Sequence, residues 1–72
     1  MAEFTHRQYD ALEYALLHGR RVAVLRRGTE LVVLPQRLAT VHGKEILVAL
    51  HPTTGDRIQL PLDELDGFEV LP

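Results

Sequence analysis

Apolar residues at helical spacing mark the first element of the chain. They recur three and four positions apart, on one face of a helix, at Tyr9, Leu12, Ala15 and Leu16. Thr5 and Gln8 form the T-x-x-Q pattern of a capping box, and Phe4 before the cap is placed for a hydrophobic staple with Tyr9. Gly19 is a natural helix terminator. These signals predict a helix over about residues 6–18.

The pattern then changes to the β-branched content typical of strands. We predict two strands, 21–26 and 29–34, joined by a tight turn at Arg27-Gly28. Pro35 is expected to end the second strand, because proline has no N–H to donate to a neighbouring strand. Residues 36–43 are interpreted as a connector that leaves room for a short strand at 38–41.

The most distinctive stretch is a predicted hairpin at Lys44–Leu62. Its first strand is apolar on nearly both faces, whereas its second alternates apolar and polar residues, so we expect the first to lie deeper. The loop Pro52–Gly55 fits a type I turn closed by a left-handed glycine. A single helical turn at 61–65 and a last strand at 68–71 complete the chain.

This order predicts a mainly β (α+β) fold in a single domain, residues 1–72. The helix is followed by five antiparallel strands over about residues 21–71. Five short strands in an open sheet would expose their edges, whereas a small SH3-like or Sm-like barrel hides them and lets the helix plug one end. A flat meander with the helix packed on one face is the alternative.

Composition narrows the classes of function. The chain of 72 residues has no cysteine and no tryptophan, and it also lacks serine and asparagine, which removes most nucleophilic constellations. Its four histidines have no metal-ligand spacing, and its glycines stand singly at turns and form no phosphate loop. We therefore predict no enzyme activity, no cofactor and no metal site. No apolar run approaches the ~20 residues that span a membrane, and the first residues show no signal-peptide pattern, so we expect a cytoplasmic location and no membrane partner.

Charge is unevenly distributed although the net charge is only −2. Four arginines, Arg20, Arg21, Arg26 and Arg27, lie around the first predicted strand with no acid among them. They are candidates for a basic patch at one rim of the barrel that binds an anion or nucleic acid, with Tyr9 or Tyr14 available for stacking. The last part of the chain is acidic, at Asp56, Asp63, Glu64, Asp66 and Glu69. Two solvated faces would explain the same pattern.

From Gly19 onward the chain resembles a known family. A basic pair after the helix glycine is followed by V-V-L-P-x-x-L at 32–38, an apolar strand at 45–49 and I-x-L-x-L-D-E-L-x-x-F-E-V at 58–70. This order is similar to that of the WYL domain, an Sm/SH3-like barrel found mostly in bacterial transcriptional regulators. The resemblance extends from about Leu12 to Leu71 and implies the small-barrel fold.

The family signatures are only partly present. Glu45-Ile46-Leu47 stands where the family has Trp-Tyr-Leu, and Glu64 stands where it has the arginine of an L-D-R-I turn. The resemblance implies binding of a nucleotide or nucleic acid through such aromatic and basic residues, but a glutamate there repels a phosphate.

Two hypotheses of function follow. The first is a non-enzymatic, WYL-like regulatory module that binds a nucleotide or nucleic acid. The second is a protein-interaction or self-assembly module that uses strand edges of the barrel to pair with a partner or a second copy.

Overall fold

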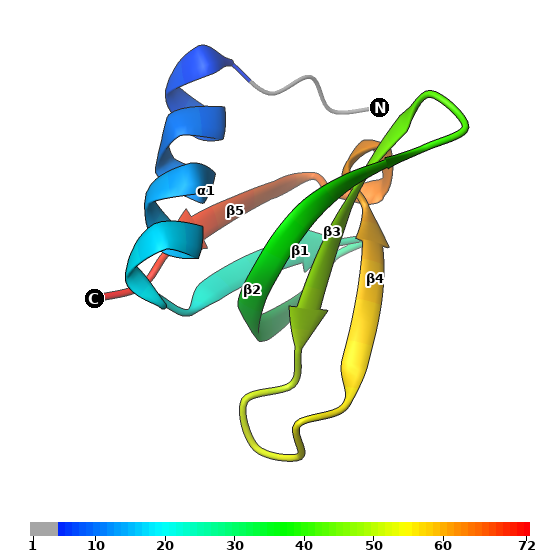
Figure 1. Ribbon diagram of the computed structural model, residues 1–72. Coiled ribbons are helices and arrows are strands. Elements are labelled where there is room, and N and C mark those ends of the chain that lie inside the picture. Colours follow the sequence, from blue (N-terminus) through cyan, green and yellow to red (C-terminus); the bar gives the residue numbers. More distant parts are fainter. Residues whose placement is uncertain (1–4) are drawn as a thin grey trace.

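The computed structural model describes residues 5–72 and shows one helix followed by a five-stranded antiparallel sheet (Figure 1). The elements are α1 (His6–His18), β1 (Val22–Arg26), β2 (Thr29–Val41), β3 (Lys44–Leu50), β4 (Arg57–Pro61), the 3₁₀ turn η1 (Leu62–Glu64) and β5 (Gly67–Val70). The predicted order of a helix and then antiparallel strands is confirmed.

Helix α1 begins and ends where the local signals indicate. The backbone N–H of Gln8 donates to the Thr5 hydroxyl at 3.3 Å, and the Gln8 side chain accepts from the Thr5 N–H at 2.8 Å. This reciprocal pair is the predicted capping box. Gly19 takes the left-handed conformation (φ 64°) and ends the helix. Phe4, the other half of the expected staple, lies outside the described residues.

Strand β2 is the longest strand and joins the two halves of the sheet. Its first part pairs with β1 and its second part with β3. The prediction that Pro35 ends this strand is wrong: β2 runs through it to Val41, and the predicted connector is mostly strand. The register shifts between Pro35 and Arg37, so Gln36 is left out of the pairing. A bulge of this kind accommodates a proline inside a strand and bends the sheet.

Both of the turns that flank β2 consist of two residues with positive φ. Arg27 (51°) and Gly28 (78°) join β1 to β2, and His42 (52°) and Gly43 (77°) join β2 to β3. Positive φ at both central residues is the mark of a type I′ hairpin turn. The hairpin between β2 and β3 was not predicted from the sequence. The signal for it was the His42-Gly43 pair between two β-rich segments.

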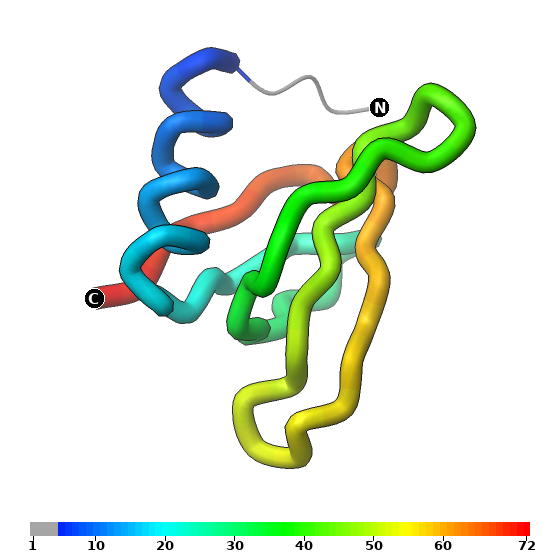
Figure 2. Tube along the Cα trace, viewed as in Figure 1, coloured from blue at the N-terminus to red at the C-terminus, as the bar shows by residue number. Residues whose placement is uncertain are grey.

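The sheet is not closed into a barrel, which corrects the predicted closure. The strand order is β4-β3-β2-β1-β5, so β4 and β5 are its two edges. The chain that connects them, η1 and Leu65, covers the open side with side chains and adds no strand pairing there. A flat meander does not describe the sheet either, because β2 bends at the bulge and β3 and β4 run steeply across the direction of β1 and β5 (Figure 2).

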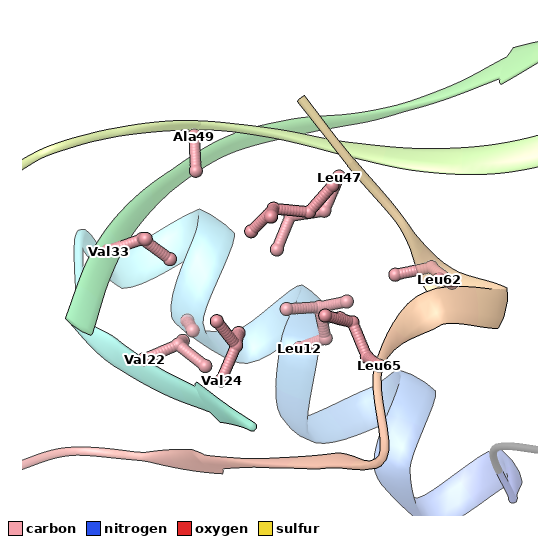
Figure 3. Packing of buried hydrophobic residues seen from close by; sticks show 10 residues of the cluster. Leu12, Val22, Val24, Val33, Leu47, Ala49, Leu62 and Leu65 are labelled. Carbon is pink, nitrogen blue, oxygen red and sulfur yellow. The ribbon is translucent and has the colours of Figure 1, made fainter. Parts of the chain in front are cut away.

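The core lies between α1, the concave face of the sheet and η1 (Figure 3). Every element contributes except β5, whose Phe68 and Val70 pack at its margin. The buried members are Leu12, Ala15, Val22, Val24, Val33, Leu47, Ala49, Leu60, Leu62 and Leu65. Three consecutive residues of β3 are buried but only one of β4, which confirms that the first strand of the long hairpin lies deeper.

Among residues 5–72, no helix has both the length and the apolar character needed to cross a membrane.

Candidate functional site

The structure divides the four candidate arginines into two pairs. Arg20 and Arg21 precede β1, whereas Arg26 ends β1 and Arg27 begins the following turn. At about 3.3 Å per strand residue, the Cα atoms of Arg21 and Arg26 are roughly 16 Å apart. One patch at a single rim of the fold is therefore not formed.

Acidic residues of the C-terminal segment meet the second pair. Arg26 Nη2 lies 3.1 Å from Glu64 Oε1, and both side chains are partly exposed. Asp66 Oδ2 accepts the backbone N–H of Arg27 at 3.1 Å, while the Asp66 N–H donates to the carbonyl of Leu25 at 2.8 Å. The basic and acidic segments seen in the sequence thus interact within one chain.

The third acid of this cluster also has a partner of its own. Lys44 Nζ lies 3.6 Å from Asp63 Oδ2. Asp63, Glu64 and Asp66 consequently point to three different groups. Within the described part of the chain, no three His, Asp or Glu side chains are grouped so that they hold a metal ion.

A hollow of about 530 Å³ lies between the β2–β3 turn and η1. We call it the turn hollow. Its lining is mixed: apolar side chains alternate with the Lys44–Asp63 ion pair, with His42 and with Glu64. The lining residues are Val41, His42, Lys44, Ile46, Pro61, Asp63 and Glu64.

A second hollow, of about 330 Å³, lies on the concave side of the sheet. We call it the arginine hollow. Leu60 of β4, Val24 of β1 and Leu31 of β2 give it apolar walls, and Thr29 and the two arginines of the β1–β2 hairpin stand around it. Its lining residues are Val24, Arg26, Arg27, Thr29, Leu31 and Leu60.

These two hollows adjoin the same edge strand from opposite faces. Leu60 lines the arginine hollow and its neighbour Pro61 lines the turn hollow, and successive strand residues point to opposite faces of a sheet. Strand β4 is an edge strand, so its outer side is not paired within the described chain. Sequence reasoning did not find this site, because it requires residues of β1, β2, β4 and η1 to be placed together.

The remaining candidates lie at the other end of the molecule. Tyr14 and Arg20 line a third hollow of about 340 Å³ together with Val70, Leu71 and Pro72. The ring of Tyr14 is stacked on His18, with 4.3 Å between centroids, and Tyr14 remains half-exposed. Tyr14 and Arg20 are thus together, as a stacking site would require, but they are separated from Arg26 and Arg27.

Tyr9 connects α1 to the start of β3. Its hydroxyl donates to Glu45 Oε1 at 2.7 Å. That hydrogen bond, with burial and the nearby negative charge as smaller causes, raises the pKa of Tyr9 above its ordinary value of 10.0. Glu45 thus anchors the helix to the start of β3.

Tyr9→Phe is expected to lower the free energy of unfolding by about 0.5–1 kcal/mol at neutral pH, since both groups are partly solvated. In the wild type the folded state holds the phenol proton more tightly than the unfolded state. The stability that this hydrogen bond contributes is therefore fully present below pH 10, and it is lost as the pH rises through the raised pKa of Tyr9. Urea unfolding of the wild type and of Tyr9→Phe at pH 7 and pH 11 measures the difference in their free energies of unfolding. An unchanged difference between them at the two pH values would contradict the assignment.

No family model, no curated protein and no solved structure matches the chain. The candidate site is therefore interpreted from its geometry.

Proposed function

We propose that this protein is a non-enzymatic, WYL-like interaction module that binds an extended segment of a partner protein along the free edge of β4. The observation that carries the proposal is an edge strand with a hollow on each face at the same point, next to Leu60 and Pro61. In recognition by strand addition, backbone hydrogen bonds supply affinity and pockets for alternate side chains supply specificity.

The register of the hairpin indicates which backbone groups are available. The N–H of His51 donates to the carbonyl of Asp56 at 2.9 Å, and hydrogen-bonded pairs alternate along an antiparallel ladder. The pairs Ala49–Ile58 and Leu47–Leu60 are then the bonded ones. The backbone N–H of Gln59 consequently points away from β3, towards the free edge.

A bound segment would place successive side chains on alternate sides of the extended sheet. One side chain would reach the arginine hollow and the next would reach the turn hollow. Of the three Arg and Lys residues that line these hollows, Arg26 and Lys44 are each paired with an acid, so that Arg27 is the single cation left for a ligand among the described residues. Phosphate contacts dominate the affinity of nucleic-acid binding, so this surface favours a protein partner over a nucleic acid.

Selection from a library of displayed random peptides, about ten residues long, tests the proposal. We expect selected peptides to bind Gln59→Ala nearly as well as wild type, because alanine keeps the backbone N–H. Gln59→Pro removes that N–H and should weaken binding at least tenfold, as measured by fluorescence anisotropy. Circular dichroism and thermal unfolding establish that both variants are folded.

Three results would count against strand addition at β4. The library yields no enriched peptide, or Gln59→Pro binds the selected peptides as well as Gln59→Ala does. Alternatively, light scattering shows a wild-type oligomer that Gln59→Pro dissociates, in which case the edge is occupied by a second copy of this chain.

A further inference from the structure

We infer that the arginine hollow recognises an apolar group together with a carboxylate, supplied by an apolar residue and an acidic residue two positions apart in the bound segment, which lie on the same face of a strand. The inference rests on the proposed function for the source of this group.

The walls of the hollow suit an aliphatic group. Val24 and Leu60 are almost completely buried, with 1% and 2% of their surface exposed, and Leu31 is half-buried beside them. These residues come from β1, β4 and β2, so the walls of the hollow are held by three strands of the same sheet. A concave apolar surface with a few polar groups around it is the usual form of a small ligand site.

The charged residues that line the hollow are both arginines. Arg26 is held by Glu64, which positions its guanidinium and offsets its charge. Arg27 is exposed, and its guanidinium has no ion-pair partner among residues 5–72. Asp66 binds the backbone N–H of Arg27, and neither Asp66 nor Glu64 lines this hollow. Arg27 is thus the cation available to an incoming carboxylate, with which arginine forms a strong, bidentate hydrogen-bonded pair.

The backbone at Arg27 is an independent reason to assign it a role. The first central residue of a type I′ turn is favoured as Asn, Asp or Gly, and Arg27 occupies it at φ 51°. A non-glycine residue kept in a sparsely populated conformation is typical of binding sites. The N–H of Arg27 is anchored by Asp66, so the turn holds the start of this side chain beside Leu31 and Leu60.

Titration with two small probes of the same size, one anionic and one neutral, tests the inference without a peptide. Hexanoate and its neutral analogue hexanamide are added to ¹⁵N-labelled protein, and amide chemical shifts are followed. We expect hexanoate to shift the amides of Arg27, Gly28, Thr29 and Leu60 with a Kd of about 1–10 mM, and hexanamide to bind at least fivefold more weakly.

Arg27→Asn is the informative variant, because asparagine suits the turn and the protein should remain at least as stable. We expect it to remove the preference for hexanoate, while the control variant Arg21→Gln, at the other end of β1, keeps it. If hexanoate displaces the selected peptides, the probe and the bound segment occupy the same hollow.

The inference is overturned if hexanamide binds as well as hexanoate, or if Arg21→Gln lowers the preference as much as Arg27→Asn. Shifts confined to the Tyr14–Arg20 hollow, or no shifts at about 50 mM probe, would also overturn it. Failure of the peptide selection alone would refute strand addition at β4 and leave the carboxylate preference of the hollow standing.

Discussion

Leu12→Ala is expected to lower the free energy of unfolding by about 3 kcal/mol, because it leaves a cavity where α1 meets the sheet. Leu12 has 1% of its surface exposed and packs in the centre of the core (Figure 3). A domain of this size has a total stability of about 5 kcal/mol, so the variant should be largely destabilised at 37 °C. Urea unfolding followed by far-ultraviolet circular dichroism measures the loss.

Leu17→Ala provides the matched control on the same helix. Leu17 has 81% of its surface exposed, and alanine is a better helix former than leucine, so the change should alter stability by less than about 0.5 kcal/mol. Equal losses for the two variants would mean that α1 does not pack on the sheet through Leu12.

Leu65→Ala is expected to cost a similar amount, about 2–4 kcal/mol. Leu65 has 1% of its surface exposed and, with Leu62, covers the side of the core on which β4 and β5 do not pair. With no strand pairing to hold that side, the buried leucines supply the closure. Thermal unfolding should show a decrease in Tm of more than about 8 °C.

Leu25→Ala is the comparison for Leu65. Leu25 lies close by, since its carbonyl accepts the N–H of Asp66, but 40% of its surface is exposed. Its truncation should cost less than about 1 kcal/mol. If Leu65→Ala were as mild as Leu25→Ala, the connection between β4 and β5 would be a loosely attached loop and the open side would be closed by other means.

Features that depend on near neighbours in the chain were predictable. The Thr5–Gln8 capping box and Gly19 bound the helix because caps involve residues three or four positions apart. The Lys44–Leu62 hairpin was predicted from alternation and from a turn that ends in Gly55, which has φ 77°. The deeper position of its first strand followed from the apolar residues on both faces.

Pro35 shows the limit of such reasoning. A proline ends a strand where its missing N–H would be needed, but the neighbouring bulge removes that need. Whether the chain stops or bulges depends on the partner strand, and here Ala49 pairs with Pro35 and Val48 with Arg37. The prediction used propensity at one residue, whereas the outcome depended on pairing with β3.

Local sequence patterns thus specify the helix, the Arg27-Gly28 turn and the mostly β character of this protein, because each rests on contacts within a few residues. The tertiary structure decides the rest: that β4 and β5 remain separate edges, that Arg26 meets Glu64, and that Leu60 and Pro61 each border a hollow. These contacts join residues far apart in the chain. They depend on the bend of β2 and on the placement of η1, which no local pattern encodes.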